Sequence, residues 1–436
     1  MSKLLYNLSI YGYQFIIWLV SPFNEKAKLW IEGRRGDVSS LMFDVGLKAS
    51  QTEHKISNIE NQNPKTVWFH CASLGEFEQG RPVIEEFRAT FPDYKILLTF
   101  FSPSGYEVRK NYAGADYICY LPSDTPANAR EFIEKVNPSI VFFVKYEFWY
   151  NYLRILHEKQ ISVISFSAIF RPNQIFFKWY GRFYRNILTY FSHIFVQNQS
   201  SLDLLQSAGI QNISIGGDTR FDRVQQIAIA RKQLPIIEQF KDGKALLIIG
   251  SCWQQDFDVI LPFLNNFAKD LKVIIAPHEI HDAEIESWRK ALHGKTVRYS
   301  EIATENADVK TCNYLIIDNI GMLSSLYQYA DFAWIGGAYG KGLHNILEAA
   351  TFGLPIFFGN KVYKKFKEAV DLERLTGAKS IADTITFEKE FIQLYDDVAL
   401  RKEKSEIIQK YVEENLGGTD KIIKYVTRTF QFGNKK

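Results

Sequence analysis

The chain has 436 residues, which is too long for one ordinary hydrophobic core and predicts two domains. Its 46% hydrophobic and 23% charged residues are typical of a folded globular protein, and its net charge of +3, without an arginine-rich stripe, argues against nucleic-acid binding. The aromatic share of 15% is high and suits a surface that meets a membrane interface, a sugar or a lipid.

The first predicted element is an apolar helix at the amino terminus. Residues 4–20, LLYNLSIYGYQFIIWLV, are 17 residues long and include several polar side chains, so they stand at the short limit for a membrane span. No small-residue cleavage site follows, so a removed signal peptide is not expected. The tryptophan, the tyrosines and basic neighbours such as Lys3 predict a helix that lies in, or dips into, an anionic membrane face. A helix packed on the first domain is the alternative.

Beyond residue 60, short apolar runs alternate with helical patterns, which indicates parallel α/β sheets. The first half contains runs at 66–70, 94–100, 117–121, 139–144, 162–168 and 193–198. The second half contains runs at 244–250, 272–278, 313–318, 331–336 and 355–359. Two doubly wound domains are therefore predicted, joined through IGGDTRFDRV (215–224). Because ligands bind beyond the carboxyl ends of such strands, each half offers a site, and two substrates would meet in a cleft between the domains.

Gly336 closes the run 331–336, and three more glycines follow it: Gly337, Gly340 and Gly342. Glycines before a helix let backbone N–H groups approach a ligand, and the helix N-terminus adds positive charge, so the pattern favours a phosphate or a nucleotide. The spacing matches neither the Rossmann nor the Walker A motif.

The next stretch, GLHNILEAATFGLPIFFG (342–359), predicts a short amphipathic helix followed by an apolar strand. At about 100° per residue, one face of the helix collects its polar side chains, His344, Asn345, Glu348 and Thr351. A solvated face is one interpretation. Its position behind the glycines favours the other, a face directed at a ligand.

Six motifs, taken in order, resemble those of the 3-deoxy-D-manno-octulosonic acid (Kdo) transferases. They are HCASLGE (70–76), SPSGYE (102–107), YLPSDTP (120–126), the Glu-x-Trp core of KYEFWYN (145–151), GGDTRFD (216–222) and GGAYGKGLHNILEAATFGLPIFFG (336–359). The resemblance implies an α/β GT-B fold, in which two doubly wound Rossmann-like domains face a cleft, with an N-terminal membrane-associated helix. It also implies an inverting transfer of Kdo from CMP-Kdo to a lipid A precursor of the lipid IVA type, in lipopolysaccharide core biosynthesis.

The same resemblance assigns the domains and the partners. Residues 1–36 are expected to form the apolar helix and catalytic loop, 37–214 the acceptor-binding domain, 215–240 the linker, and 241–436 the CMP-Kdo-binding domain with C-terminal helices. The expected partners are CMP-Kdo, the lipid A precursor and inner-membrane lipid, without nucleic acid. The expected location is the cytoplasmic side of the cell inner membrane.

The resemblance places the general base on Glu32, in KLWIEGRRGD (28–37). Glu32 fits the family spacing relative to Trp30 but stands one residue early relative to Gly36. The alternative for Glu32 is an ion pair with Lys28 or Arg35. The implied donor-binding residues are Arg220, Ser251, His278, Gly337, His344, Asn345 and Glu348.

Within this donor set, Asn345 and Glu348 are expected to contact ribose hydroxyls, and Arg220 to offset the charge of the leaving phosphate. A surface charge near a hinge is the alternative for Arg220. The implied acceptor-binding residues are Ser73, Gly75, Glu76, Ser104, Glu147 and Arg171. For Glu76 the alternative is a charge that stabilises a helix N-terminus without touching substrate.

Neither a metal ion nor a cofactor is expected, because a GT-B enzyme can stabilise its leaving group with a helix dipole and basic side chains. The cysteines stand singly, without metal-ligand spacing, and predict neither a disulfide nor a zinc site: Cys71, Cys119, Cys252 and Cys312.

Two departures from the family pattern concern the sites. The family reads Pro-Arg-His where this chain has Pro277, His278 and Glu279, so an arginine clamp on a carboxylate or phosphate is missing. The family's Glu-x-Glu-x-Trp has Lys145 here in place of its first glutamate.

Two other enzyme classes share two α/β halves and a ribose-binding glutamate, namely UDP-sugar-dependent GT-B glycosyltransferases and nucleotide-sugar epimerases. A two-lobed solute-binding protein is the non-enzyme alternative. That alternative requires export, against which the missing cleavage site and the lone cysteines count.

Overall fold

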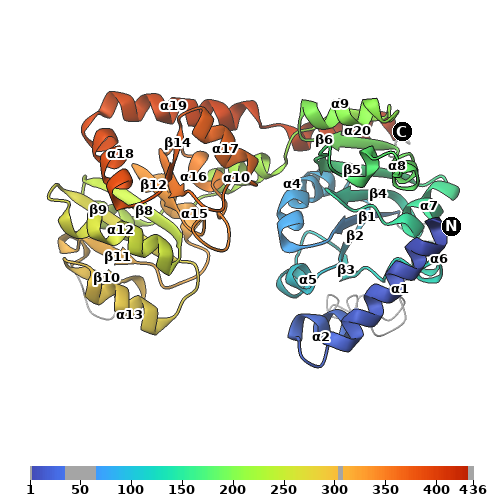
Figure 1. Cartoon of the computed structure of the whole chain (residues 1–436), viewed down its shortest axis with the longest axis horizontal. Coiled ribbons are helices and arrows are strands. Elements are labelled where there is room, and N and C mark those ends of the chain that lie inside the picture. Colours follow the sequence, from blue (N-terminus) through green and yellow to red (C-terminus); the bar gives the residue numbers. More distant parts are fainter. Residues whose placement is uncertain (1, 35–64, 303–307, 431–436) are drawn as a thin grey trace, which may run out of the picture. The chain divides into compact units, whose positions relative to one another are not determined.

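The computed structural model describes residues 2–34, 65–302 and 308–430. The chain forms two compact units (Figure 1). Unit 1 comprises residues 1–223 together with 416–436, and unit 2 comprises residues 224–415. The described part of each unit contains one seven-stranded sheet in which every neighbouring pair is parallel.

The unit 1 sheet has the strand order β3-β2-β1-β4-β5-β6-β7. Its strands are β1 (Thr66–Cys71), β2 (Lys95–Phe100), β3 (Tyr117–Tyr120), β4 (Pro138–Val144), β5 (Ser162–Ala168), β6 (His193–Val196) and β7 (Ile213–Ile215). The central strands are buried along almost their whole length, which explains why they read as continuous apolar runs rather than alternating ones.

Helices cover both faces of this sheet. One face packs on α6 (Pro126–Val136), α7 (Tyr150–Glu158), α8 (Arg182–Leu188) and α9 (Gln199–Ser207). The other face packs on α4 (Leu74–Thr90) and α20 (Gly418–Thr429), with α5 (Pro103–Arg109) beside them. Each face thus has its own apolar core.

The unit 2 sheet has the strand order β10-β11-β9-β8-β12-β13-β14. Its strands are β8 (Ala245–Cys252), β9 (Leu271–Pro277), β10 (Thr296–Arg298), β11 (Tyr314–Ile316), β12 (Phe332–Ile335), β13 (Ile356–Gly359) and β14 (Ala378–Ile381). One core lies under α12 (Gln254–Asn266), α13 (Asp282–Ala291) and α18 (Thr384–Asp396). The other named helices of this region are α10 (Arg220–Ile229), α11 (Pro235–Lys241), α15 (Leu323–Leu326), α16 (Leu347–Ala350), α17 (Lys367–Arg374) and α19 (Val398–Glu414).

All of the apolar runs predicted as strands form strands. The sequence predicted no strand at β10 or β14, and it indicated β7 only through Gly216 and Gly217, the two glycines that close a strand at the linker; all three strands lie at sheet edges. These strands have three or four residues and are only partly buried, so their residue pattern differs little from that of a loop.

The carboxyl-terminal helix does not stay with unit 2, although the expected second domain ran to residue 436. The chain returns to unit 1 at Leu416. Ile422 and Val426 of α20 are buried in a unit 1 core, and Asp222 accepts hydrogen bonds from the N–H groups of Gly417 and Thr419, at 2.7 Å each. The apolar face of α20 is therefore satisfied by the first sheet.

The amino-terminal segment forms α1 (Ser2–Val20) and α2 (Glu25–Glu32). One face of α1 packs on unit 1 through Tyr6, whose hydroxyl donates to Asp124 at 2.6 Å, and through Asn7, whose side chain accepts from Asn151 at 3.0 Å. Its opposite face exposes large apolar side chains, among them Leu4, Leu8, Tyr11, Phe15 and Trp18. Among residues 2–34, 65–302 and 308–430, no helix is both long and apolar enough to cross a membrane.

Candidate active site

Each sheet has a central point from which its strands are added in opposite directions, between β1 and β4 in unit 1 and between β8 and β12 in unit 2. A ligand crevice forms at such a point, beyond the carboxyl ends of the two strands. The loops that follow β1 and β4, and those that follow β8 and β12, hold many of the residues that the sequence predicted for the two sites.

A buried histidine and a buried glutamate join β1 to the loop after β4. The Nε2 atom of His70 lies 3.1 Å from Oε2 of Glu147, and the same oxygen accepts from Trp149 Nε1 at 2.5 Å. The other ring nitrogen of His70 lies 2.8 Å from the Thr99 hydroxyl. Glu147, predicted to bind acceptor, is thus fixed by both partners, which gives a physical reason for the Glu-x-Trp spacing.

A second carboxyl lies close to Glu147. Ser73 precedes α4, and its hydroxyl donates to Oε2 of Glu76 in the first turn at 3.1 Å; Gly75 lies between them. Burial, and then the charge of Glu147, raise the pKa of Glu76. The main cause of this shift is burial, which acts on a carboxylate at a helix start whether or not it binds substrate, so both roles of Glu76 stay predictions.

The two remaining acceptor candidates are exposed. Ser104, in the first turn of α5, has its hydroxyl 2.9 Å from that of Ser102. Arg171 follows β5, and its guanidinium donates to the Tyr146 hydroxyl at 3.4 Å. Tyr146 follows Lys145, whose φ of 70° is rare for a non-glycine residue and marks a tightly constrained strand end.

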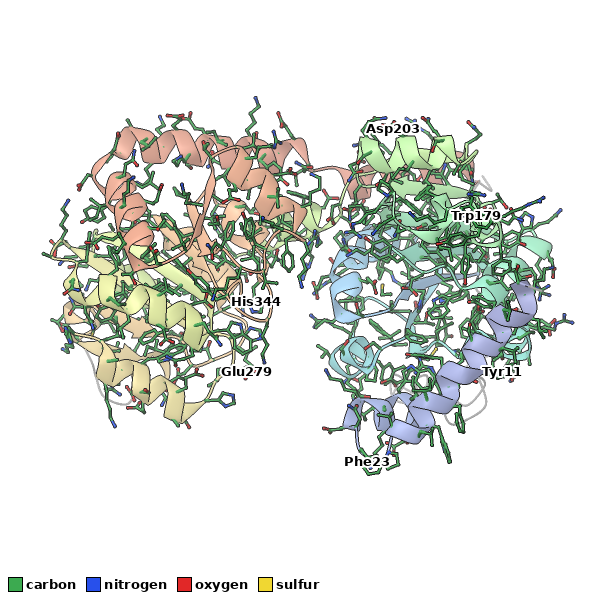
Figure 2. The ribbon with its side chains drawn as sticks, in the orientation of Figure 1. Tyr11, Phe23, Trp179, Asp203, Glu279 and His344 are labelled. Carbon is green, nitrogen blue, oxygen red and sulfur yellow. The ribbon has the colours of Figure 1, made fainter. Side chains whose placement is uncertain are left out.

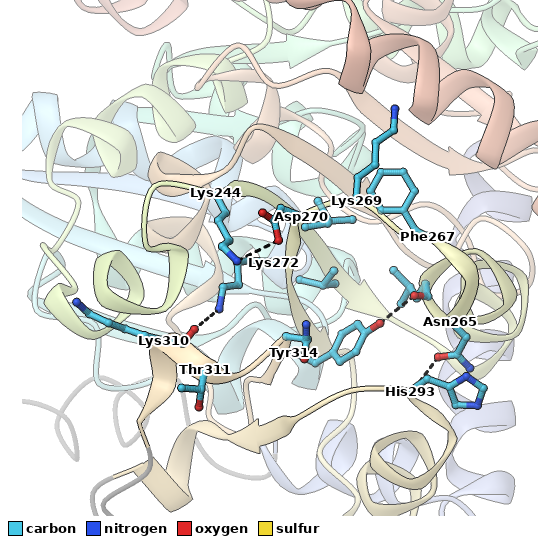
Figure 3. A pocket seen from close by; sticks show the side chains of 14 residues that line it. Lys244, Asn265, Phe267, Lys269, Asp270, Lys272, His293, Lys310, Thr311 and Tyr314 are labelled. Carbon is cyan, nitrogen blue, oxygen red and sulfur yellow. Dashed lines mark hydrogen bonds and ion pairs between the residues drawn. The ribbon is translucent and has the colours of Figure 1, made fainter.

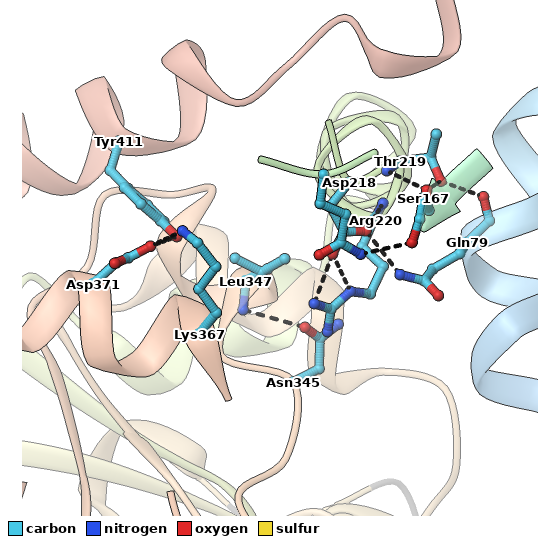
Figure 4. Close-up of polar contacts among 11 residues, drawn as sticks. Gln79, Ser167, Asp218, Thr219, Arg220, Asn345, Leu347, Lys367, Asp371 and Tyr411 are labelled. Carbon is cyan, nitrogen blue, oxygen red and sulfur yellow. Dashed lines mark hydrogen bonds and ion pairs between the residues drawn. The ribbon is translucent and has the colours of Figure 1, made fainter. Parts of the chain in front are cut away.

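Arg220 belongs to unit 1, whereas the other predicted donor residues belong to unit 2. Its guanidinium donates to Oδ2 of Asp218 from Nε at 3.0 Å and from Nη2 at 2.8 Å, and Gln79 donates to Oδ1 at 2.9 Å (Figure 4). Burial opposes ionisation of Asp218, but the Arg220 charge and these hydrogen bonds outweigh it and lower the pKa of the carboxyl. Arg220 is therefore held at the start of α10 by a buried carboxylate, close to the end of the first segment of unit 1 at Arg223, and both interpretations, a donor-site charge and a hinge charge, stay predictions.

Glu32 is the last residue of α2, and its side chain is 46% exposed. Its carboxylate lies 4.0 Å from Lys28, a long contact between exposed groups that stabilises little. Arg35, the other predicted ion-pair partner, lies outside the described residues, as does Gly36.

Two residues hold the end of α2 against unit 1. Trp30 is buried, and the Arg34 guanidinium stacks 4.0 Å from its ring. Arg34 also donates to the carbonyls of Leu121 at 2.9 Å and Phe101 at 2.6 Å, in the loops after β3 and β2. Burial lowers the pKa of Arg34 to about 9. Glu32 is therefore carried on a firmly anchored segment at the carboxyl edge of the sheet.

In unit 2, the glycine loop is held by a buried aspartate. Oδ2 of Asp256 accepts from the N–H groups of Gly337 at 2.8 Å and Trp253 at 3.1 Å, and Oδ1 accepts from Trp334 Nε1 at 3.3 Å. Gly337 has φ of 94°, and a Cβ there would lie 2.4 Å from the Gly342 carbonyl oxygen. Only glycine fits this turn without strain.

Asp256 and Asp258 have the Asp-x-Asp spacing of some metal sites, but two residues apart on a helix they point in different directions. Asp256 is buried, whereas Asp258 is exposed and accepts from Gln254 at 2.6 Å. Burial raises the pKa of Asp256 to about 6. Within the described residues, no group of three or more His, Cys, Asp or Glu side chains is arranged to hold a metal ion.

Three aromatic rings stack beside the glycine loop. Trp253 and His344 are nearly coplanar, with 12° between their planes, and Trp253 Nε1 lies 2.9 Å from His344 Nε2. The His278 ring stacks 4.4 Å from Trp253 and 4.1 Å from His344, and the Lys341 ammonium lies 4.6 Å from the Trp253 ring centre. His278 and His344, both predicted for the donor site, are thus brought together.

The hydrogen bond to Trp253 favours one tautomer of His344. An indole N–H can only donate, so Nε2 of His344 accepts in this bond and the ring proton then sits on Nδ1. Burial, and then His278, lower the pKa of His344 to about 4, so the ring is neutral at pH 7; burial also lowers the pKa of His278. The Cδ2–Nε2 edge faces Gly337, which leaves Nδ1–H at the opposite side of the ring.

The predicted helix at 342–359 is shorter than expected. Only Leu347–Ala350 are helical, so His344 and Asn345 precede the helix instead of opening it. The positive φ of Gly342 directs the chain away from a helical path, and the Asn345 side chain accepts from Leu347 N–H at 3.2 Å. Asn345 also donates to Glu348 at 3.0 Å. A helix of one turn supplies little dipole, so the predicted helix-dipole contribution to anion binding is wrong here.

Ser251 adds a further constraint at the end of β8. Its φ is 52°, and its carbonyl oxygen would lie 2.2 Å from a Cβ at Gly336. The close approach of these two backbones explains the first glycine of the loop.

A pocket of about 270 Å³ lies at the opposite end of the unit 2 sheet, where β8, β9 and β11 begin (Figure 3). Lys272 is buried there and donates to the carbonyls of Lys310 at 2.6 Å and Cys312 at 2.5 Å, while Lys244 pairs with Asp270 at 3.1 Å. These lysines already bind carbonyl and carboxylate groups of the protein. Because the pocket lies where the strands begin, it is distinct from the predicted donor site, whose unit 2 residues lie where the strands end.

Sequence reasoning missed His70, Trp253 and Asp256. Trp253 stands three residues after the predicted run 244–250, and Asp256 stands three residues later again, which is the spacing of a residue that caps a helix start. Those signals were available. The partners of Asp256 and Trp253, Gly337 and His344, are 81 and 91 residues away, and no local pattern indicates them.

Three comparisons with known proteins bear on the chain. A family model described as 3-Deoxy-D-manno-octulosonic-acid transferase (kdotransferase) matches residues 48–223. A 3-deoxy-D-manno-octulosonic acid transferase from Rickettsia felis is 24% identical, over 83% of this chain and 79% of its own length. The protein of the same name from Aquifex aeolicus is 25% identical, over 80% of this chain and 92% of its own length.

Solved structures share the fold at low identity. A UDP-GlcNAc 2-epimerase from Neisseria meningitidis matches with a TM-score of 0.60 at 15% identity, covering 83% of this chain and all of its own. A glycosyltransferase from Rickettsia africae matches with a TM-score of 0.52 at 12% identity, covering 86% of this chain and all of its own. These likenesses support two Rossmann-like units and do not discriminate between substrates.

Proposed function

Because the chain belongs to the Kdo transferase family, and is therefore a glycosyltransferase that moves Kdo, we propose that its donor is CMP-Kdo and its acceptor a lipid A precursor of the lipid IVA type. The observation that carries the proposal is the family match over residues 48–223, which covers most of unit 1, including Glu76, Glu147 and Arg220. The constrained glycine loop of unit 2 supports a nucleotide donor.

On the donor side, the neutral Nδ1–H of His344 would donate to phosphate oxygens. The N–H groups of the four loop glycines already donate within the protein, that of Gly337 to Asp256, so these glycines would shape the turn beside the phosphate. Lys341, beside the Trp253 ring, would supply the positive charge that the missing family arginine supplies elsewhere. Asn345 and Glu348, already joined to each other, would share their hydrogen bonds with the ribose hydroxyls. Ser251 and His278 would line the same loop cluster.

In the proposed reaction, Glu32 removes the proton of the acceptor hydroxyl as that oxygen attacks the anomeric carbon of Kdo. The bond between this carbon and the CMP phosphate oxygen breaks, and CMP leaves with the electron pair. Arg220 offsets the charge on the leaving phosphate, and the attack inverts the anomeric centre. No metal or cofactor is part of the scheme, so EDTA is expected to leave turnover unchanged.

On the acceptor side, Ser73, Glu76, Ser104 and Arg171 would bind hydroxyl and phosphate groups of the precursor, with the backbone of Gly75 beside them. Glu147 orients this site through its buried contacts. The exposed apolar face of α1 would lie on the cytoplasmic face of the inner membrane, close to the lipid substrate.

The test incubates the full chain with CMP-Kdo and a lipid A precursor and reads product masses by mass spectrometry. A mass increase of one or more Kdo units is expected, and an unchanged lipid would overturn the proposal. Glu32→Gln is expected to lower turnover at least about hundredfold while CMP still binds. Glu25→Gln, at the other end of α2, is the matched control and should keep full turnover.

The donor nucleotide is tested separately by thermal unfolding. CMP or CMP-Kdo is expected to raise the unfolding temperature, because a ligand that binds only the folded state stabilises it. Stabilisation by UDP without any by CMP would instead favour a UDP-sugar enzyme. Stabilisation by a free small solute, with neither nucleotide effective, would favour a binding protein.

A further inference from the structure

An exposed aromatic turn on unit 1 takes no part in either candidate site. The turn comprises residues 176–182, FFKWYGR, and is called the aromatic turn below. Trp179 is 89% exposed and Tyr180 is 59% exposed. Large aromatic side chains gain much from burial, so a tryptophan left almost fully in water indicates a surface that becomes covered by something else.

The exposure of Trp179 is built into the fold. Phe176 anchors the base of the turn in the core, and Arg185 donates to the carbonyls of Phe176 at 2.9 Å and Lys178 at 3.1 Å. A Cβ at Gly181 would lie 1.7 Å from the carbonyl oxygen of Ile175, so the turn is as tight as glycine allows. The Trp179 and Tyr180 rings therefore point into solvent from a turn whose backbone is held in place.

The charge around the turn is of one sign. Residues 169–190, IFRPNQIFFKWYGRFYRNILTY, contain four basic residues and no acidic one: Arg171, Lys178, Arg182 and Arg185. Tryptophan and tyrosine with basic neighbours are typical of protein segments that sit among lipid headgroups, and the basic charge is complementary to anionic lipids.

The aromatic turn lies beside α1. Phe183, next to the turn, has its ring centre 6.0 Å from that of Tyr6, on the face of α1 that packs on unit 1. Figure 2 places Trp179 and Tyr11 of α1 on the same side of unit 1. The only charged residue of α1 is Lys3, so neither the helix nor the segment around the turn contains an acidic group.

We propose that the aromatic turn is a second membrane contact, in which Trp179 and Tyr180 insert among anionic headgroups beside α1. This inference rests on the membrane attachment in the proposed function and deepens it. A unit that is attached to a membrane along one helix can still rock about the axis of that helix. A second fixed contact on the same unit removes that freedom and sets which edge of unit 1 faces the lipid.

The experiment measures binding of the full chain to vesicles of phosphatidylethanolamine and phosphatidylglycerol, without lipid A precursor, by sedimentation. The double variant Trp179→Ala/Tyr180→Ala is expected to bind at least about fivefold more weakly than the wild type. The matched control is Ile320→Ala/Ile385→Ala in unit 2, where the side chains are 95% and 80% exposed; it should bind like the wild type. Circular dichroism checks that each variant is folded.

A second readout locates the ring itself. Brominated lipids should quench the fluorescence of the wild type more than that of Trp179→Phe, because the difference reports Trp179 alone. If the wild type binds vesicles and the double variant binds equally well, the aromatic turn is not a contact, although membrane attachment stands. If the wild type does not bind at all, the proposed attachment fails and this inference fails with it. Neither result depends on Kdo transfer.

Discussion

The favoured tautomer of His344 gives the sharpest prediction, through the variant Trp253→Phe. Phenylalanine keeps an aromatic ring against His278 but removes the N–H that donates to His344 Nε2. A hydrogen bond of this kind contributes about 1 kcal/mol, or about fivefold in the ratio of the two His344 tautomers. The Nδ1–H form is then expected to fall from about five sixths of the population to about half.

The effect on nucleotide binding should be small and is calculable. Since only the Nδ1–H form donates to phosphate in the proposed site, affinity follows its population, and CMP should bind about twofold more weakly. Nitrogen NMR of ¹⁵N-histidine-labelled protein measures the tautomer directly, with His344→Gln to assign the signal. Trp288→Phe, which removes an indole donor to Gln254 in the same unit, is the control. An Nε2–H tautomer in the wild type, or an unchanged spectrum in Trp253→Phe, would refute the reasoning.

Three further predictions concern residues that hold the loops and helices of the candidate sites in place. Gly337→Ala should weaken CMP binding, measured by calorimetry, at least about tenfold, because the residue has a positive φ and its new Cβ would clash with the backbone. The control is Gly340→Ala, whose Cβ meets no atom within 4 Å; its affinity for CMP should stay within about twofold of the wild-type value. Burial raises the pKa of Asp256 from 3.8 to about 6. Between these two pH values the native state keeps a proton on Asp256 that the unfolded state has released. The free energy of unfolding therefore falls by up to ~3 kcal/mol as the pH rises from 3.8 to about 6. Urea unfolding of Asp256→Asn should show a shallower fall over that range, and an unchanged slope would contradict this. Arg34→Ala should cost ~2–3 kcal/mol and loosen α2, measured by thermal unfolding, while exposed Lys26→Ala should be neutral.

Much of the architecture was predictable because of a single physical constraint. Strands buried on both faces must be apolar along their whole length, so β1, β4, β8 and β12 are visible as runs. Once the sheets are known to be parallel, the loops after these strands are the expected ligand sites. The edge strands β10 and β14 escaped prediction because their partial burial leaves no such pattern.

The candidate residues divide in the same way. Glu147 and Gly337 were predictable from their positions after strands and from a family resemblance. Their surroundings were not: His70 beside Glu147, and Asp256 beneath Gly337, are joined to them only by the fold. The expected helix at His344 shows the limit of periodicity, because the helix begins only at Leu347, whose N–H donates to the Asn345 side chain, although the helical pattern already includes His344.

By itself, the sequence determined where the strands lie, how many sheets form and at which ends ligands bind, since these follow from local patterns of apolar and small residues. Only the tertiary structure decided which polar groups face one another. It made His344 neutral, gave Asp256 its raised pKa, tied Arg34 to the loops of two strands and returned α20 to unit 1. The reason is that crossover connections bring together residues far apart in the chain, and burial then sets the charge that each can carry.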